Sequence, residues 1–236
     1  MAYQRTTAWH KINLLNKKIR IIQGGQGASK TYSILQTIFE LVCSGAASTF
    51  TIVTNTYPQL RDGVITDMKN IFTAAGIPFD TYYQKGSQNI EMYGSQIQFR
   101  HVDNSDFHKG KGARRNYLFI NEANRTSFAS VEQMMTRTDK VIWIDYNPDR
   151  EFWVHEHFLK GDNQDVDFLI LTYNDNECLA PGERAEIEKR RSNVNWWRVY
   201  GEGQLGTYSD RQIYSYEFVD EIPKDAKRIP SGMDFG

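Results

Sequence analysis

A glycine-rich segment that ends in Lys30 and Thr31 carries the clearest chemical signal in the sequence. It follows the β-branched run 19–22 and precedes a helical pattern, which is the layout of a phosphate-binding P-loop. The glycines let backbone N–H groups point inward, and the N-terminus of the following helix attracts anions. Lys30 would contact the β- and γ-phosphates of a bound polyphosphate, and Thr31 would place its hydroxyl on Mg²⁺. The predicted nucleotide-binding residues are Gly24, Gly25, Gln26, Gly27, Ala28, Ser29, Lys30 and Thr31.

A nucleotide site of this kind needs a second apolar strand that ends in acidic groups, one to hold the water shell of the metal and one to orient the attacking water. The run 117–120 has this form and is followed by Asn121 and Glu122. We expect Glu122 to be the catalytic carboxylate that orients the attacking water, and Asn121 to hydrogen-bond a metal-bound water. Because Asn121 brings no charge, we expect weak metal affinity. Ser29 replaces the last glycine of the usual P-loop, which leaves a turn without a ligand as the alternative, and the pairing of the two motifs argues against it.

A third apolar run, 141–144, ends in the polar segment 145–148, which contains Asn147 before a proline. A polar side chain at this place can touch both the γ-phosphate and the neighbouring carboxylate strand, so Asn147 is predicted to report hydrolysis to the rest of the fold. An Asx turn that begins before the proline is the structural alternative.

The elements that must position these residues follow from apolar runs that recur along the chain with helical patterns between most of them. This alternation predicts an α/β fold, a P-loop NTPase with a mainly parallel central sheet flanked by helices. The predicted strands cover residues 19–22, 50–53, 117–120, 141–144 and 168–171. Residues 33–42 place apolar side chains on one face of a helix that would carry the P-loop at its N-terminus.

Two further segments depart from this alternation. Polar and apolar residues alternate weakly along residues 88–100, on both sides of Tyr93-Gly94-Ser95, which predicts a β-hairpin. From about Pro181 a charged helical segment, an aromatic segment and several glycines follow one another, which indicates a small lid-like C-terminal subdomain. We therefore expect an ATPase core over residues 1–180 and a lid or linker over 181–230.

Composition limits the possible classes of protein. The chain has 236 residues and a net charge of −1, so any contact with nucleic acid must come from local basic patches. The two cysteines, Cys43 and Cys178, lack metal-ligand spacing, and Cys43 is expected to be a buried thiol in a reduced, cytoplasmic protein. No apolar run is long enough to cross a bilayer.

The order of these motifs resembles that of the large terminase subunit of tailed bacteriophages, the ATPase that pumps DNA into a procapsid. The resemblance covers nearly the whole chain, and each of its motifs is weak alone, whereas their order and spacing are specific. The matching segments are 24–31 for the P-loop, 56–64 after the second strand, 119–123 for the Walker B strand, 147–148 for the coupling motif, 171–176 beyond it, and 232–236 for the first strand of an RNase H-like nuclease domain.

This resemblance implies partners and a location. The partners would be double-stranded DNA, the portal protein and the small terminase subunit, with a homo-oligomeric ring on the procapsid, a monomer in isolation and no membrane. The protein would act in the host cell cytoplasm with ATP and Mg²⁺. Asp234 would be the first metal ligand of the nuclease, of which residues 231–236 are a remnant. Its partner carboxylates are missing from the chain, so we expect no DNA cleavage.

In ring-shaped ATPases an arginine from the neighbouring subunit commonly completes the site and speeds the reaction by roughly 10³-fold or more. Gln26 stands where many relatives have a P-loop arginine, so the charge must come from elsewhere. The candidates are Arg61, Arg114 and Arg115, and the resemblance favours the last two, which belong to a basic loop, 109–115, expected to project from the sheet. For any single arginine, a solvated side chain is the alternative.

Two rival functions stay open from the sequence. One is a different nucleic-acid-dependent P-loop ATPase, such as a helicase, although the further strand-end motifs of that class are not found. The other is a nucleotide-binding assembly module with little turnover, which Gln26 and Asn121 make plausible.

Overall fold

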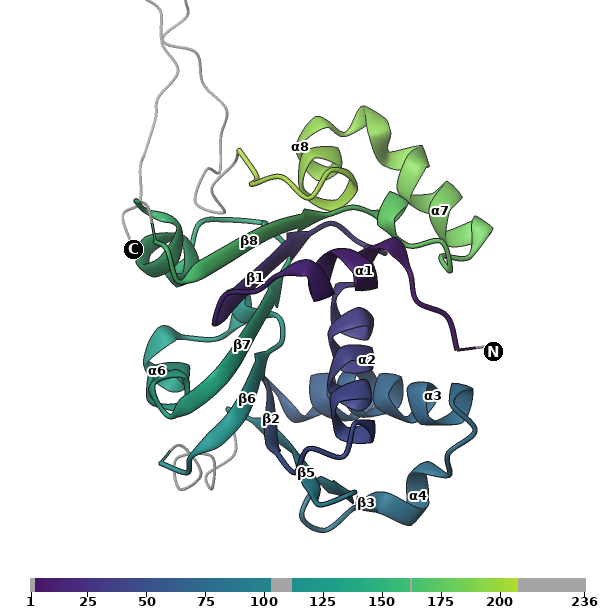
Figure 1. Ribbon diagram of the computed structural model, residues 1–236. Helices are drawn as coiled ribbons and strands as arrows, with labels where there is room; N and C mark the ends of the chain where they lie inside the picture. The colour runs from purple at the N-terminus through teal and green to yellow at the C-terminus, as the bar shows by residue number, and fades with distance from the viewer. Residues whose placement is uncertain (1–2, 103–111, 162, 208–236) are drawn as a thin grey trace, which may run out of the picture.

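The computed structural model describes residues 3–102, 112–161 and 163–207, and its central feature is an eight-stranded sheet with helices on both faces (Figure 1). The strand order is β3-β4-β5-β2-β6-β7-β1-β8, and the five pairs from β5 to β8 are parallel. The strands are β1 (Ile19–Gly24), β2 (Thr49–Thr54), β3 (Tyr83–Gln84), β4 (Asn89–Met92), β5 (Ser95–His101), β6 (Arg115–Ile120), β7 (Thr138–Tyr146) and β8 (Val166–Leu171). All five predicted strands, and the predicted mainly parallel α/β fold, are therefore confirmed.

The helices are α1 (Thr7–Leu14), α2 (Lys30–Cys43), α3 (Thr66–Ala74), α4 (Phe79–Tyr82), α6 (Phe128–Thr136), α7 (Pro181–Glu188) and α8 (Val194–Trp196). The helices from α1 to α4 pack on one face of the sheet, and α6 packs on the other. Short helical turns that matter below are η1 (Gln59–Ile65), η2 (Ala123–Arg125) and η6 (Trp197–Gly201). None of the helices in the described ranges is long and apolar enough to cross a membrane.

Two hydrophobic clusters hold the sheet in place, one on each face. Neighbouring residues of one strand enter opposite clusters: Phe119 of β6 packs with α2 and α3, whereas Leu118 and Ile120 pack with α6. Trp143 and Ile144 of β7 divide in the same way. Burial on both faces explains why these strands read as continuous apolar runs, and it fixes their register because a slip of one residue would exchange the two faces.

The predicted hairpin is confirmed, and the structure adds its place in the sheet. β4 and β5 turn through Tyr93 and Gly94, both of which have positive φ values (50° and 77°), the geometry of a tight two-residue hairpin turn. β5 then runs parallel to β2, so the hairpin extends the sheet at its edge.

The expectation that Cys43 is buried is wrong, because Cys43 is the last residue of α2 and is exposed.

Residues 181–207 pack against the carboxyl edge of the sheet near the P-loop. A buried hydrogen-bond chain makes one of the connections: Tyr146 Oη donates to Gln23 Oε1 (2.8 Å), and Gln23 Nε2 donates to the carbonyl of Gly203 (2.7 Å). The proposed boundary near residue 180 stays a prediction, and the predicted segments beyond residue 207 lie outside the described residues.

Candidate nucleotide-binding site

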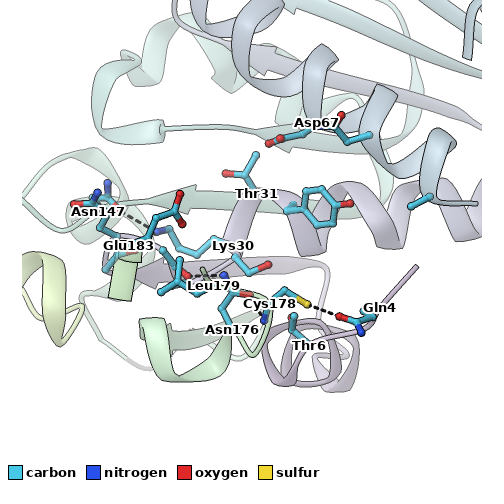
Figure 2. A pocket seen from close by; sticks show the side chains of 18 of the residues that line it. Gln4, Thr6, Lys30, Thr31, Asp67, Asn147, Asn176, Cys178, Leu179 and Glu183 are labelled. Atoms are coloured by element: carbon cyan, nitrogen blue, oxygen red, sulfur yellow. Dashed lines mark hydrogen bonds between the residues drawn. The ribbon is translucent and has the colours of Figure 1, made fainter. Parts of the chain in front are cut away.

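The predicted P-loop lines an open cavity of about 930 Å³ beside the N-terminus of α2 (Figure 2). Its volume lies within the range of pockets that hold small ligands. P-loop residues 25–31 form one wall, and the other walls include residues from α3, the segment after β7, the N-terminal segment, and the segment that leads into α7 together with the start of α7. These include Gln4, Thr6, Asp67, Asn147, Asn176, Leu179 and Glu183.

The glycines of the P-loop are required by close backbone packing. A Cβ atom on Gly24 would lie 2.4 Å from the carbonyl oxygen of Leu171, and one on Gly25 would lie 2.2 Å from that of Tyr200. Ser29, the departure from the usual pattern, has φ 59° and ψ 19°, a left-handed conformation that a glycine would adopt more easily. The loop therefore accommodates serine at this position in a left-handed backbone conformation.

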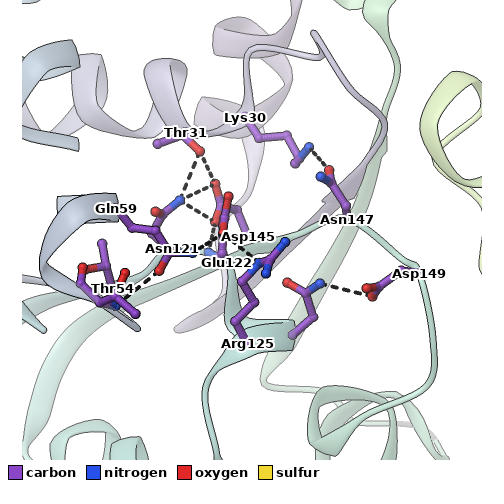
Figure 3. Close-up of polar contacts among 12 residues, drawn as sticks. Lys30, Thr31, Thr54, Gln59, Asn121, Glu122, Arg125, Asp145, Asn147 and Asp149 are labelled. Atoms are coloured by element: carbon purple, nitrogen blue, oxygen red, sulfur yellow. Dashed lines mark hydrogen bonds and ion pairs between the residues drawn. The ribbon is translucent and has the colours of Figure 1, made fainter. Parts of the chain in front are cut away.

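Lys30 lies half-buried beneath the P-loop. Its Nζ donates to the carbonyls of Gly24 (2.9 Å) and Gly25 (2.8 Å) and to Oδ1 of Asn147 (2.8 Å), as Figure 3 shows for Asn147. Burial lowers the pKa of Lys30 to about 8, and the carboxylates of Asp145 and Glu122 partly oppose this shift. The structure therefore brings Asn147 to the predicted phosphate-binding lysine.

Glu122 follows β6 at the same edge of the sheet and has a left-handed backbone (φ 49°). Its Oε2 accepts a hydrogen bond from Gln59 Nε2 (2.8 Å) in η1 and lies 3.1 Å from Arg125 Nε in η2. Burial raises the pKa of Glu122, and nearby Asp145 raises it further. Neither Gln59 nor Arg125 was predicted as a site residue. Gln59 lies in the segment 56–64, which resembles the terminase family, but no role was assigned to it.

Asp145, the last charged residue of β7, is the group that the sequence interpretation missed. Its Oδ2 accepts from Thr31 Oγ1 (2.5 Å), and its Oδ1 accepts from Asn121 Nδ2 (3.0 Å) and from the backbone N–H of Glu122 (2.8 Å). It is 1 % exposed, and burial raises its pKa. The sequence does show an acidic residue near the end of an apolar run, but only the structure shows that this strand lies beside the one that carries Asn121.

The residues predicted to hold a metal are only partly brought together. Asn121 Nδ2 lies 3.1 Å from Thr31 Oγ1, whereas Asp234 lies outside the described residues. Among the described residues no group of three or more His, Cys, Asp or Glu side chains could hold a metal. Mg²⁺ at nucleotide sites needs fewer protein ligands, because phosphates and waters supply the rest. The oxygens of Thr31 and Asp145 suit this ion.

The arginine prediction needs a correction. Arg115 does not project from the sheet: it begins β6 at the edge opposite to Glu122, is 4 % exposed, and donates to the carbonyls of Met134 (3.1 Å) and Ala113 (2.8 Å). A guanidinium buried in this way must satisfy its donors inside its own chain, so it is not accessible to a neighbouring subunit. Arg114 is exposed, and residues 109–111 of the basic loop lie outside the described residues.

The other candidate, Arg61, is also exposed. It forms an ion pair with Asp62 (2.6 Å) and lies over the ring of Tyr57. Both contacts are at the surface, where ion pairs contribute little to stability. Both Arg61 and Arg114 are therefore exposed enough to contact a neighbouring subunit.

The parallel sheet with a P-loop between β1 and α2 defines a P-loop NTPase fold. The family model described as phage terminase large subunit matches residues 16–204, and the chain belongs to this family. Among curated protein sequences, none matches the chain.

Solved structures of large terminases from two phages share the fold. The large terminase of a thermophilic bacteriophage has a TM-score of 0.73 at 17 % identity, over 86 % of this chain and 54 % of that one. The same phage protein in complex with ATP-gamma-S has a TM-score of 0.64 at 19 % sequence identity, and the match covers 80 % of this chain and 48 % of that one. The large terminase ATPase domain of Thermus phage P74-26 has a TM-score of 0.62 at 16 % sequence identity, and the match covers 86 % of this chain and 94 % of that one. The chain thus spans about half the length of the first of these terminases.

The lowered pKa of Lys30 predicts a pH dependence of nucleotide binding. Above about pH 8 the free protein loses the Lys30 proton, and a bound phosphate favours the charged form, so binding at higher pH takes up a proton. We expect ADP affinity to fall about tenfold between about pH 7 and about pH 9. Calorimetry at about pH 8.5, in buffers of different ionisation enthalpy, should detect the proton uptake.

The matched variant for this measurement is Lys30→Arg, because a guanidinium stays protonated throughout the range. Its ADP affinity should be lower than that of the wild type and independent of pH. The same pH dependence in both proteins would contradict the role of Lys30.

Proposed function

We propose that this chain binds ATP in the P-loop cavity and hydrolyses it, as the ATPase motor domain of a viral terminase that moves double-stranded DNA into a procapsid. One observation carries the proposal: Lys30 and Thr31 converge with Glu122 and Asn147 at the carboxyl ends of three adjacent parallel strands. Ligands collect at this edge in open α/β sheets. The family membership and the ATP-gamma-S complex of the thermophilic bacteriophage relative support the choice of nucleotide.

The residues of the site would divide the work of phosphoryl transfer among them. Lys30 would exchange its bonds to the loop carbonyls and Asn147 for bonds to phosphate oxygens, and the backbone N–H groups of the P-loop would hold the rest of the polyphosphate. Mg²⁺, when bound, would neutralise charge that develops between the β- and γ-phosphates. Both described contacts of Glu122 fall on Oε2, so Oε1 can accept a hydrogen bond from the attacking water.

Asn147 would transmit the state of the γ-phosphate to the segment after α8. Release of Lys30 from Asn147 changes the end of β7, where the carbonyl of Pro148 accepts from the N–H of Gly206 (2.9 Å). The same segment contacts the P-loop directly, since the N–H of Gln26 donates to the carbonyl of Tyr200 (2.9 Å). These contacts favour a coupling role for Asn147 over a simple Asx turn.

The partners follow from the family and remain proposals. They are double-stranded DNA, the portal protein, the small terminase subunit and further copies of the chain in a ring, with action in the host cytoplasm. Hydrolysis measured with and without DNA separates this function from an assembly module with little turnover, because only the motor should hydrolyse ATP faster when DNA is present.

Glu122→Gln tests the catalytic carboxylate. The amide keeps the size of the side chain and the hydrogen bond from Gln59, but it positions and deprotonates water poorly, so nucleotide should still bind while turnover falls by about 100-fold or more. Lys30→Ala serves as the contrasting variant and should lose both binding and turnover with the fold intact. If Glu122→Gln turned over ATP at the wild-type rate, another carboxylate would have the catalytic role.

A mixing experiment tests whether Arg114 acts in a neighbouring subunit. Arg114→Ala protein keeps its own P-loop, and Lys30→Ala protein keeps its arginine, so a mixture at high concentration should recover ATPase activity that neither variant has alone. In an assembled motor made of one variant only, the ATPase rate should be roughly 10³-fold lower than that of the wild type. Full activity of Arg114→Ala in the assembled motor would point to Arg61 or to the absence of an arginine in trans.

A further inference from the structure

A buried carboxylate lies between the P-loop and the strand that carries Glu122. Asp145 accepts the Thr31 hydroxyl hydrogen bond at 2.5 Å, and its neighbour across the sheet is Asn121, because Ile120 of β6 pairs with Ile144 of β7. Figure 3 shows these side chains meeting at one point. The position of Asp145 is set by the register of two strands that are buried on both faces.

In P-loop NTPases the Mg²⁺ ion is held by the hydroxyl of the P-loop Ser or Thr together with an Asp from the Walker B strand. In this chain the corresponding residue on β6 is Asn121, and the group that it presents to Thr31 and Asp145 is the Nδ2 donor. An N–H donor cannot ligate a cation. The carboxylate that contacts the P-loop hydroxyl comes instead from β7.

The charge of Asp145 has no direct cationic partner among its hydrogen bonds in the described residues. Its donors are the Thr31 hydroxyl, the Asn121 amide and the backbone N–H of Glu122, all of them neutral. Lys30 Nζ is engaged by Asn147 and two loop carbonyls. The charge of Lys30 acts on Asp145 without a hydrogen bond between them, and a divalent cation beside Thr31 would add a direct cationic partner for the buried carboxylate.

We propose that Asp145 is the carboxylate that holds the nucleotide's divalent cation opposite Thr31, so that β7 supplies the charge that Asn121 on β6 lacks. Asn121 is then a positioning residue that orients Asp145. The inference rests on the proposed nucleotide site, and it replaces the expectation that an uncharged residue at position 121 means weak metal binding.

The test uses Mn²⁺ as a spectroscopic probe for the cation, in the presence of ADP. Electron paramagnetic resonance measures the free Mn²⁺ that remains at each concentration of protein, and calorimetry in EDTA measures ADP binding without metal. Asp145→Asn should weaken Mn²⁺ binding by at least tenfold and leave ADP affinity in EDTA unchanged. Asp139→Asn, the same substitution at the exposed opposite end of β7, is the matched control and should change neither quantity.

A second variant moves the carboxylate back to β6. Asn121→Asp combined with Asp145→Asn keeps one carboxylate and one amide at the same two positions, and it should recover Mn²⁺ affinity to within about fivefold of the wild type. This double variant decides the matter if Asp145→Asn alone does not fold, since its recovery supports the proposal and its failure to bind Mn²⁺ overturns it.

Thermal unfolding in EDTA separates metal binding from a structural role. A structural role predicts that Asp145→Asn lowers Tm in EDTA and weakens ADP binding in EDTA and in Mn²⁺ equally, and that result would overturn the proposal. Unchanged Mn²⁺ affinity in folded Asp145→Asn would also overturn it. Wild-type protein that bound no ADP at all would instead remove the proposed function, and the metal assignment with it.

Discussion

The parallel register of β1, β7 and β6, which brings three donors to the carboxylate of Asp145, is the constraint on which the rest of the site depends. One carboxylate accepts from the first turn of α2, from a side chain at the end of β6 and from the backbone N–H of Glu122. These donors come from segments that are far apart in sequence, so the site forms only when the parallel register of β1, β7 and β6 is correct. The two hydrophobic clusters maintain that register, which links core packing directly to the geometry of the site.

The P-loop is held from a second direction by the C-terminal part of the described chain. Gly24 and Gly25 pack against the carbonyls of Leu171 and Tyr200 at distances that leave no room for a Cβ atom. Because the same loop would hold phosphates, any movement of the loop on nucleotide binding must be shared with residues 197–207. These contacts join the P-loop directly to residues 197–207, so the proposed ATP turnover would act on this segment first.

Much of the fold could be predicted from the sequence, because strands buried on both faces produce continuous apolar runs and P-loops require glycine at fixed spacings. The turn at Tyr93 and Gly94 was also predictable from local chemistry. The role of Asp145 was not, since it depends on which strand lies beside β6 and in what register. Burial of Arg115 was missed for a similar reason: its carbonyl partners include Met134, whose position relative to β6 is a tertiary property.

A crystal structure of the chain with ATP-gamma-S and Mg²⁺ tests the central claim most directly, namely that the P-loop cavity is the nucleotide site. Phosphate oxygens should lie within hydrogen-bond distance of Lys30 Nζ and of the backbone N–H groups of residues 27–31, and the hydrogen bond from Lys30 to Asn147 should be broken. The claim would be contradicted by nucleotide bound elsewhere, or by phosphates in the cavity while Lys30 keeps its bonds to Asn147 and to the carbonyls of Gly24 and Gly25.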